Sequence, residues 1–381
     1  MEKSPKVSII LPCLNEEESI GIYLDSIKEV LKNSKISSEI IVVDNASSDK
    51  SKEIVKNKKI KNLKIIEEKT RGYGSAYLRG IKESKGEYIF MTDSDGTYDF
   101  RNFPRFVKKL EQGNDFVIGN RFTDKMKKKS MPFLHKYIGN PLLSGTLRLF
   151  FRTRIRDAHC GMRAIKKQAL EKLNLKTIGM EFASEMIIKA LRKNLKISEI
   201  PIGYHPRKGK AKLKTFRDGW RHLRFMLLYS PLFLFFIPGI ILFSLGVLSM
   251  MWIYLGTPQI AGIEIYFHPL FLSSLLTIIG YQIIIFGFFA KNYSIVHLDE
   301  RDSRIEKLYN KITIEKVSIA GIGLILIGAI IYISIFRQWV LSGFGELNAI
   351  RESIIALTGV VLGIQSIFSA FMLSIIGIKE K

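Results

Sequence analysis

Cysteine is scarce in this 381-residue sequence, and its N-terminus lacks the apolar core of a secretory leader. The two cysteines, Cys13 and Cys160, cannot build a disulfide framework or a multi-cysteine zinc site. The first apolar run has only five residues and ends at Pro12, which is too short for a signal peptide. We therefore expect the N-terminal part to stay on the side of the membrane where it is synthesised.

Acidic residues are in deficit over the first 230 positions. The whole chain has 58 Lys and Arg against 35 Asp and Glu, which gives a formal net charge of +23. Residues 1–230 contribute +22 of this charge, whereas residues 231–381 contribute only +1. This division predicts a basic head joined to a nearly neutral, apolar tail.

Charged residues are absent from four long stretches of the tail, at 231–254, 269–290, 317–336 and 354–376. Each stretch has 20 or more residues, which is enough for a helix to cross roughly 30 Å of hydrocarbon. A soluble domain with four buried helices is the alternative interpretation, but four such stretches in a row are typical of a membrane protein. Residues 231–381 are therefore predicted to form a membrane domain with four transmembrane helices.

Basic residues are unevenly distributed among the loops of the tail. The segment 291–316 has six Lys and Arg, whereas the segment 253–268 has none. Basic loops favour the cytoplasmic side, and four crossings return the chain to the side on which it started. The sequence therefore predicts a multi-pass protein of the cell membrane whose head and C-terminus are cytoplasmic.

The head, predicted as a domain over residues 1–204, alternates between apolar strands and amphipathic helices. Strands are expected at 7–11, 39–43, 63–66, 87–91 and 115–118, and helices at 19–31, 49–55 and 75–84. The alternation predicts an α/β fold with a mostly parallel, Rossmann-like sheet, in which ligands bind at the carboxyl ends of the strands. Polar side chains fall at those ends: Asn15, Glu16, Asp44, Asp93 and Asp95.

Two carboxylates, Asp93 and Asp95, bracket one serine directly after an apolar strand. Such a pair can hold Mg²⁺ or Mn²⁺, cations that often take one or two carboxylates together with substrate phosphates. An Asx-rich turn leading into Gly96 is an equally good interpretation of the motif alone. Asp44 likewise suits either a hydrogen bond to a nucleoside or the cap of the following helix.

Glycines at positions 72 and 74 precede a predicted helix, and glycine lets backbone approach a ligand closely. Gly72 is therefore a candidate for contact with a phosphorylated ligand. The motif is not the dinucleotide fingerprint, because it follows the third strand and Tyr77 occupies the position of the last glycine or alanine. A nicotinamide-dependent enzyme is therefore disfavoured.

The segment 205–230 interleaves basic residues with aromatic residues and leucine, just before the first apolar stretch. This composition is typical of a helix that lies in an anionic membrane interface. Nucleic acid is the alternative partner, but direct attachment to a membrane span favours membrane lipid, and we expect no nucleic-acid partner. Glu181 and Glu185, four residues apart on a predicted helix, are candidates for a general base or for surface salt bridges.

Taken together, residues 7–18, 44–49, 71–80 and 93–95 resemble the family 2 glycosyltransferases of the GT-A fold. A second set of motifs resembles the dolichol-phosphate mannose and glucose synthase branch: Met131-Pro132, His135, Gly139-Asn140, Asp157, Gly161, Arg163, Arg207, Gly209 and Lys212-Leu213. The resemblance covers roughly residues 5–230. It implies a GT-A domain, followed by the interfacial segment and the membrane helices.

The resemblance also implies roles for individual residues. The nucleotide sugar would be bound by Pro12, Asn15, Glu16, Asp44, Gly72, Asp93 and Lys212. The metal would lie at Asp93 and Asp95, with Thr97 at the position where mannose synthases commonly have glutamine. Arg207 would clamp the donor phosphates together with Lys212 and act with Asp95 and Arg121 in catalysis. The acceptor would meet Arg121, His135 and Arg163.

The implied reaction is inverting, metal-dependent transfer of a hexose from a nucleotide sugar to a dolichyl or polyprenyl phosphate. GDP-mannose, UDP-glucose and a UDP-N-acetylhexosamine remain open as donors, because Thr97 and His135 depart from the mannose synthase pattern. A polysaccharide synthase with a sugar hydroxyl acceptor is one alternative, although the chain lacks a Gln-x-x-Arg-Trp motif. A non-enzymatic membrane adaptor is another, and a homo-oligomer is left open.

Overall fold

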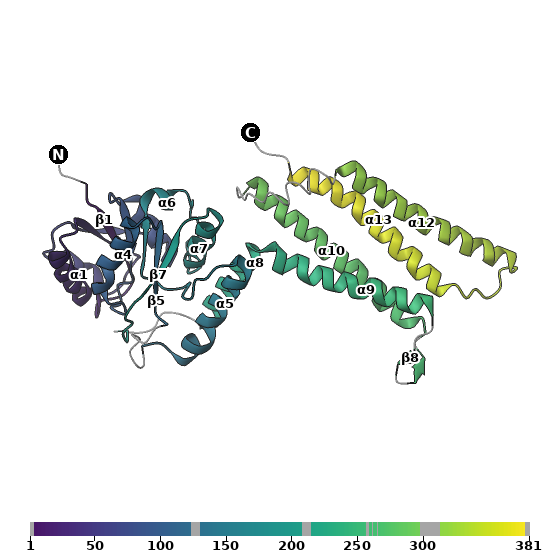
Figure 1. Cartoon of the computed structure of the whole chain (residues 1–381), viewed down its shortest axis with the longest axis horizontal. Coiled ribbons are helices and arrows are strands. Elements are labelled where there is room, and N and C mark those ends of the chain that lie inside the picture. The colour runs from purple at the N-terminus through teal and green to yellow at the C-terminus, as the bar shows by residue number, and fades with distance from the viewer. Residues whose placement is uncertain are drawn as a thin grey trace. The chain divides into compact units, whose positions relative to one another are not determined.

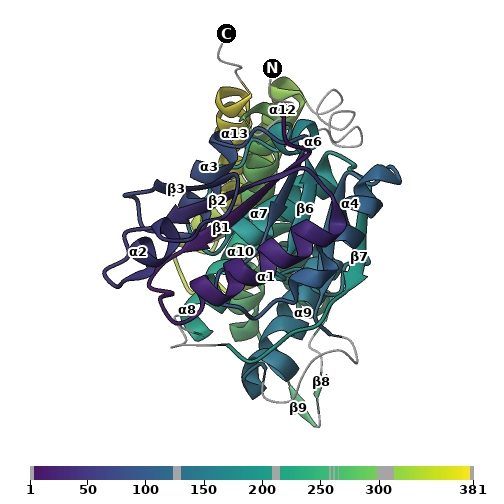
Figure 2. The same ribbon diagram turned by 90° about the vertical axis from the view of Figure 1, so that its left-hand side faces the viewer.

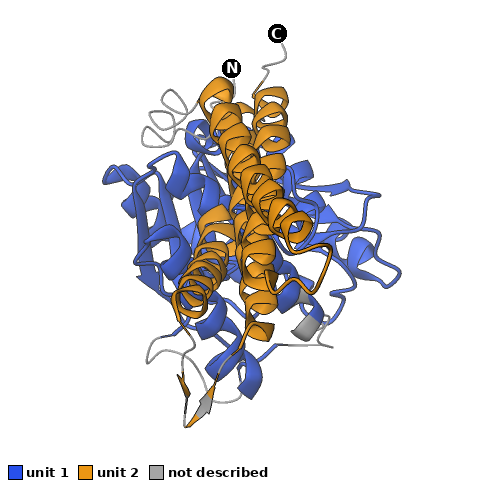
Figure 3. Cartoon of the chain, turned by 90° about the vertical axis from the view of Figure 1, so that its right-hand side faces the viewer, with its two compact units in different colours: residues 1–229 blue, residues 230–381 orange. Residues whose placement is uncertain are grey.

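The computed structural model describes residues 4–122, 130–207, 215–256, 259–260, 262–264, 266–297 and 313–377. The chain divides into two compact units between Tyr229 and Ser230, coloured separately in Figure 3. Lys212 lies outside the described residues, and so do parts of the predicted 205–230 segment.

The first unit is built on a seven-stranded sheet with the strand order β3-β2-β1-β4-β6-β5-β7 (Figure 2). The pairs β1–β2, β2–β3, β1–β4 and β5–β7 are parallel, and only β6 runs antiparallel to its neighbours β4 and β5. The predicted mostly parallel α/β sheet is therefore confirmed. The strands are β1 (Val7–Cys13), β2 (Ser38–Asp44), β3 (Leu63–Glu67), β4 (Tyr88–Met91), β5 (Phe116–Asn120), β6 (Arg163–Lys166) and β7 (Ile197–Pro201).

The helices of the first unit pack their apolar faces on this sheet. In α1, which was predicted at 19–31, Ile20, Leu24 and Ile27 share one face of the helix and are fully buried. The described helices of this unit are α1 (Ile20–Ser34), α2 (Ser51–Lys56), α3 (Tyr73–Lys82), η1 (Phe100–Asn102), α4 (Phe103–Glu111), η2 (His135–Gly139), α5 (Asn140–Phe151), α6 (Lys167–Glu171), α7 (Phe182–Arg192) and α8 (Thr215–Leu228) (Figure 1).

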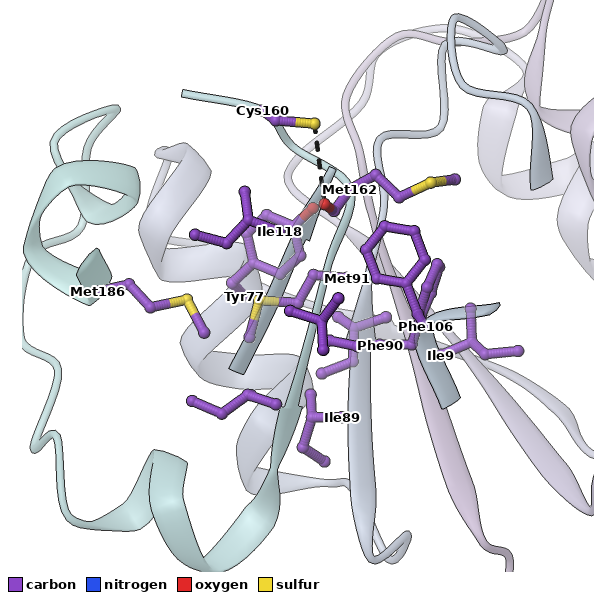
Figure 4. Packing of buried hydrophobic residues seen from close by; sticks show 14 of the residues in the cluster. Ile9, Tyr77, Ile89, Phe90, Met91, Phe106, Ile118, Cys160, Met162 and Met186 are labelled. Carbon is purple, nitrogen blue, oxygen red and sulfur yellow. Dashed lines mark hydrogen bonds between the residues drawn. The ribbon is translucent and has the colours of Figure 1, made fainter. Parts of the chain in front are cut away.

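An aromatic cluster packs against β4, the strand that leads to the Asp93-Ser94-Asp95 motif. The ring of Phe90 meets the rings of Phe100, Phe103 and Phe106 edge-on, with centroid distances of 5.0 to 5.6 Å. Figure 4 shows Phe90 and Phe106 among the buried side chains around this strand. Edge-on aromatic pairs contribute about 0.5–1.5 kcal/mol each beyond the area that they bury, so the end of β4 is firmly held.

The second unit consists mainly of long apolar helices, and four segments are long and apolar enough to cross a membrane: Leu232–Leu255, His268–Val296, Ile314–Leu341 and Ile350–Ile376. The prediction of four spans is confirmed. The elements are η3 (Leu232–Phe236), α9 (Ile237–Leu255), β8 (Gln259–Ile260), β9 (Ile263–Glu264), α10 (His268–His297), α12 (Ile314–Leu341) and α13 (Ile350–Ile376).

Three of these helices extend beyond the predicted uncharged stretches. The helices continue past the uncharged stretches, so α10 includes Lys291, α12 includes Arg337 and α13 includes Arg351. Long basic side chains near a helix end can reach the polar interface while the backbone stays helical. Close packing also shapes this unit, because a Cβ on Gly321 would lie 2.7 Å from the carbonyl oxygen of Gly363.

Candidate active site

The polar residues predicted at the strand ends are brought together by the strand order. β1 lies between β2 and β4, and both pairs are parallel, with Cys13 opposite Asp44 and Ile10 opposite Met91. The carboxyl ends of all three strands therefore open on one edge of the sheet. The loop after β4 is tied to the end of β1 there, because the Ser94 hydroxyl donates to the carbonyl oxygen of Pro12 at 2.6 Å.

Asp93 is enclosed by tyrosine hydroxyls and by a glycine backbone. Tyr73 donates to its Oδ1 at 3.0 Å and Tyr77 at 3.5 Å. On the other side, a Cβ at Gly161 would lie only 2.5 Å from Oδ2, so a side chain at this position would displace the carboxylate. Burial, and to a lesser extent the negative charge of Asp95, raise the pKa of Asp93 to about 7.

Asp95 lies between a threonine and an arginine. Its Oδ1 accepts hydrogen bonds from the backbone N–H of Thr97 at 3.0 Å and from the Thr97 hydroxyl at 2.7 Å. Its Oδ2 lies 3.2 Å from Nη1 of Arg207. Thr97, which was predicted on the metal side, is thus a residue that orients Asp95.

Arg207 connects two loops that are far apart in the sequence. Its Nη2 pairs with Glu16 Oε1 at 2.5 Å while Nη1 faces Asp95. Its Nε is buried and has no hydrogen-bond partner among the described residues. The guanidinium therefore neutralises Glu16 in the loop after β1 and Asp95 in the loop after β4.

The donor set at this edge fits a hard divalent cation. Asp93 and Asp95 offer only carboxylate oxygens as ligands, and two negative charges so close in the chain favour a cation between them. Within the described ranges, no group of three or more His, Cys, Asp and Glu side chains is placed to hold a metal. The protein would therefore supply one or two carboxylates, as Mg²⁺ sites completed by substrate phosphates often do.

The nucleotide side of the predicted site is formed by the loop after β1. Asn15 has a φ of 52°, and its Oδ1 accepts from the Ser48 N–H at 2.7 Å. The N–H of Glu16 donates to the Ser51 hydroxyl at 2.7 Å. Asp44 ends β2 and is 5% exposed, and its Oδ1 is buried without a hydrogen-bond partner in the described part of the chain. Such an atom marks a place where a ligand donor fits.

Gly72 is placed by contacts within the protein. Its N–H donates to Asn45 Oδ1 at 2.8 Å, and a Cβ there would lie 2.1 Å from the carbonyl oxygen of Ile178. Glycine is therefore required by this close approach of two backbones. Its predicted contact with a phosphorylated ligand stays a prediction.

A loop after α5, at 157–163, ends at the first residue of β6 and supports the site through contacts that the sequence did not reveal. The fully buried Asp157 accepts from Arg121 Nε and Nη2, both at 2.8 Å, and from the Arg121 N–H at 2.9 Å. The Tyr98 hydroxyl accepts from the Gly161 N–H at 2.7 Å. This loop fixes the side chain of Arg121 and the wall against Asp93.

Arg163 was predicted to contact the acceptor, but the structure gives it a different role. Its Nε, Nη1 and Nη2 each donate to a backbone carbonyl, of Cys160, Ala183 and Ala158 respectively. The side chain is 3% exposed. Because the guanidinium is taken up by the protein's own backbone, we correct the prediction and assign Arg163 to the support of the 157–163 loop.

The two candidate bases differ in their surroundings. Glu185 accepts from the N–H groups of Lys176 and Thr177, and from the Thr177 hydroxyl at 2.6 Å. It is therefore a structural residue that holds the loop before α7. Glu181 has a buried Oε2 without a hydrogen-bond partner among the described residues. His135 is the first residue of η2, a helix that follows β5 along the chain and not β1, β2 or β4.

Comparison with known proteins gives two matches to family profiles. The profile of glycosyl transferase family 2 matches residues 8–174, and that of the glycosyltransferase family 2 C-terminal transmembrane region matches residues 289–377. The low-salt glycan biosynthesis hexosyltransferase Agl6 of Haloferax volcanii is 37% identical over 375 residues, which cover 98% of this chain and 90% of that protein.

Two further relatives match just over half of this chain. The dolichol-phosphate mannosyltransferase of Pyrococcus furiosus is 30% identical over 224 residues, 57% of this chain and 62% of that protein. The dolichyl-phosphate hexose transferase of Haloferax volcanii is 27% identical over 213 residues, 56% of this chain and 89% of that protein.

Proposed function

The chain belongs to glycosyltransferase family 2 and is a multi-pass membrane glycosyltransferase of the GT-A fold, and on this premise we propose its reaction. We propose that it transfers a hexose from a nucleotide sugar to a dolichyl or polyprenyl phosphate, with inversion at the anomeric carbon. The names of two relatives include dolichol or dolichyl phosphate, and that of the relative matching nearly the whole chain includes hexosyltransferase. These names support a dolichyl or polyprenyl phosphate as the acceptor and a hexose as the transferred sugar.

The observation that carries this proposal is the constellation at the ends of β1, β2 and β4. Asp95 pairs with Arg207, which also pairs with Glu16, and Asp93 lies two residues before Asp95. The buried Oδ1 of Asp44 has no hydrogen-bond partner among the described residues. Asp44 would accept a hydrogen bond from the nucleoside of the donor. Asn15, Glu16, Pro12 and Gly72 would form the wall around it.

The two carboxylates would hold Mg²⁺ or Mn²⁺ against the donor diphosphate, where such a cation stabilises the negative charge of the leaving nucleotide. Arg207 now pairs with Glu16 and Asp95. A bound metal ion would neutralise these carboxylates in its place, and Arg207 would then turn toward the diphosphate. Tyr73 keeps Asp93 oriented through its hydroxyl, and Thr97 does the same for Asp95.

A lipid phosphate fits the charge of the head and the apolar tail. The second pKa of a phosphate monoester is about 6, so the acceptor is largely dianionic at neutral pH and needs little help from a base. One acceptor oxygen would form the new bond to the anomeric carbon as the bond to the nucleotide breaks. Arg121 would meet the acceptor through Nη1, since Asp157 holds its other nitrogens, and His135 would lie on the acceptor side.

The proposed orientation places the head and the C-terminus in the cytoplasm. The basis is the excess of Lys and Arg in the head and in 291–316, together with the even number of spans. Nucleotide sugars made in the cytoplasm would reach the site directly.

Transfer to a sugar hydroxyl is the second candidate, and Glu181 is the residue that favours it. A hydroxyl has a far higher pKa than a phosphate and requires a base, and the Glu181 Oε2 atom is buried without a partner among the described residues. Glu185 is excluded from this role by its bonds to Lys176 and Thr177.

The proposed function is tested with the full chain in detergent. The protein is incubated with polyprenyl phosphate, Mg²⁺ or Mn²⁺ and a panel of nucleotide sugars, and the lipid products are identified by mass. A polyprenyl-phosphate hexose is expected with one donor of the panel. A glycosylated sugar formed in a parallel incubation with oligosaccharide acceptors, without any glycolipid, would favour the second candidate.

A further inference from the structure

The second unit contains a pocket of about 390 Å³ where α9 and α12 end and α13 begins. Half of its lining residues are apolar and come from α12, from α13 and from the residue before α13: Ile330, Ile331, Ile335, Ala349 and Ile355. The other half are polar or amphipathic: Tyr254, Ser334, Gln338, Asn348 and Glu352. An apolar pocket with a few converging polar groups, of roughly 300–1,000 Å³, is the usual form of a small-molecule site.

Helix packing frames this pocket. α12 and α13 run side by side in opposite directions (Figure 1), and a Cβ on Gly328 would lie 2.9 Å from the carbonyl oxygen of Ala356. Arg351, in the first turn of α13, donates from Nη1 to the carbonyl oxygen of Gly256 at 3.3 Å. This bond ties the start of α13 to the end of α9. The walls of the pocket are therefore helices whose positions are fixed by their own contacts.

Three polar side chains in the pocket are not used by the protein itself. Gln338 lies in the last turn of α12, Asn348 lies in the segment between α12 and α13, and Glu352 lies in the first turn of α13. None of these side chains has a hydrogen bond or an ion pair within the described part of the chain. Glu352 belongs to the candidate span Ile350–Ile376, and an ionisable side chain within a span is usually paired or functional. These groups are therefore available to a ligand.

The polar side of the pocket favours hydroxyl groups over an anionic headgroup. Among the described residues that line it there is no Lys, Arg or His, so a phosphate would meet the Glu352 carboxylate without a cation to offset the repulsion. Hydroxyl groups can donate to carboxylate and amide oxygens, and they can accept from the amide groups of Gln338 and Asn348. The ring of Tyr254 adds a flat apolar surface with a polar tip. A hexose offers several hydroxyls together with apolar C–H faces.

The apolar side of the pocket indicates that the ligand is a lipid. Its isoleucines belong to α12 and α13, which are long and apolar enough to cross a membrane, so a hydrocarbon chain can lie along them. Leu232 and Tyr254 lie near opposite ends of the first candidate span, Leu232–Leu255. The pocket is therefore near the membrane face opposite to Leu232, where the chain has just left the first unit.

We propose that this pocket binds a lipid with a neutral sugar headgroup, in the leaflet opposite to Leu232. The sugar hydroxyls would pair with Gln338, Asn348 and Glu352, and the lipid chain would lie along the isoleucines of α12 and α13. The membrane unit would then recognise a glycolipid in addition to anchoring the chain. This inference goes beyond the proposed function, because it concerns the second unit alone, and its failure would leave the proposed reaction of the head unaffected.

The test uses the full chain in nanodiscs of phosphatidylcholine. The probe is a monoglucosyl lipid with a diazirine and an alkyne on its alkyl chain, and two matched probes carry phosphocholine or phosphoethanolamine in place of glucose. Labelled peptides are identified by mass spectrometry. The variants are Gln338→Leu and Glu352→Leu, and the matched control is Gln282→Leu on α10, a glutamine that does not line the pocket. Thermal unfolding of each variant establishes that it is folded.

We expect the glucosyl probe to label peptides from 330–355, and an unlabelled glucosyl lipid to remove this labelling. Free glucose at the same concentration should not remove it, and the other two probes should label these peptides weakly. Gln338→Leu and Glu352→Leu should each weaken the binding of the glucosyl probe about tenfold, because each removes a hydrogen bond to the sugar. Gln282→Leu should bind the probe as the unsubstituted protein does.

Equal labelling by all three probes would overturn the proposal, because the pocket would then hold only the lipid chain. Stronger labelling by the phosphoethanolamine probe would overturn it as well, since an ammonium group would then be the partner of Glu352. Competition by free glucose as effective as that by the glucosyl lipid would show that no lipid is required. Absence of labelling, or undiminished labelling in both folded variants, would equally refute the site.

Discussion

Replacing Gly161 by alanine tests whether the position of Asp93 is essential. An added Cβ would lie 2.5 Å from Asp93 Oδ2 and 2.9 Å from its Cγ, whereas ordinary contacts begin at 3.4 Å. The carboxylate would have to move by roughly 0.9 Å, and a displacement of about 1 Å at a reacting centre can cost about 10²-fold in rate. Gly161 is not among the glycines with positive φ, so the added methyl group acts through space and not through backbone strain.

The assay measures glycolipid formation, Mn²⁺ affinity and thermal unfolding for Gly161→Ala. We expect a loss of turnover of about 10²-fold and weaker Mn²⁺ binding, with a cost of about 1–3 kcal/mol in the free energy of unfolding from overpacking. Gly203→Ala is the matched control, because the nearest atom to its added Cβ would be Asp99 Cβ at an ordinary 3.6 Å. Wild-type turnover and Mn²⁺ affinity in Gly161→Ala would refute the reasoning.

Three further outcomes are expected. Asp95→Ala should lose Mn²⁺ binding by calorimetry and about 10²–10³-fold of turnover, while Asp25→Asn, at an exposed ion pair, should keep both. Because the pKa of Asp93 is raised from 3.8 to about 7, the folded protein holds a proton that the unfolded chain releases. The free energy of unfolding without metal should therefore fall as the pH rises from 3.8 to about 7. Because a metal ligand must be deprotonated, Mn²⁺ affinity should fall about tenfold for each pH unit below 7. Glu185→Ala should lower the free energy of unfolding in urea by about 2–4 kcal/mol, whereas Glu181→Gln should leave transfer to a lipid phosphate within about twofold. A large loss in Glu181→Gln would instead favour a hydroxyl acceptor.

The strands that carry the site could be predicted because their sequences are continuously apolar. β1, β2 and β4 lie in the middle of the sheet and are almost wholly buried, so polar residues directly after them mark the ends of the strands. β6 and β7 were not predicted. β6 is a four-residue strand that begins with the buried Arg163, and no local periodicity distinguishes so short a segment.

The supporting contacts of the site could not be predicted, because they join residues far apart in the sequence. Arg121 and Asp157 are 36 positions apart, and the pair forms only when the 157–163 loop folds back onto β5. The contact of Gly161 with Asp93 depends on the same loop. Local patterns suggested what Asp93 and Arg121 could bind, but not which protein groups already hold them.

The central claim is that a lipid-borne phosphate attacks a nucleotide sugar at Asp93 and Asp95, and a comparison of acceptors tests it most directly. The full chain is incubated with Mn²⁺ and the active donor of the panel, together with polyprenyl phosphate or with the same polyprenol lacking phosphate. We predict a hexosylated product with the phosphate only, and about 10²–10³-fold less of that product in Asp95→Ala. Equal transfer to the unphosphorylated alcohol, or undiminished transfer in Asp95→Ala, would contradict the claim.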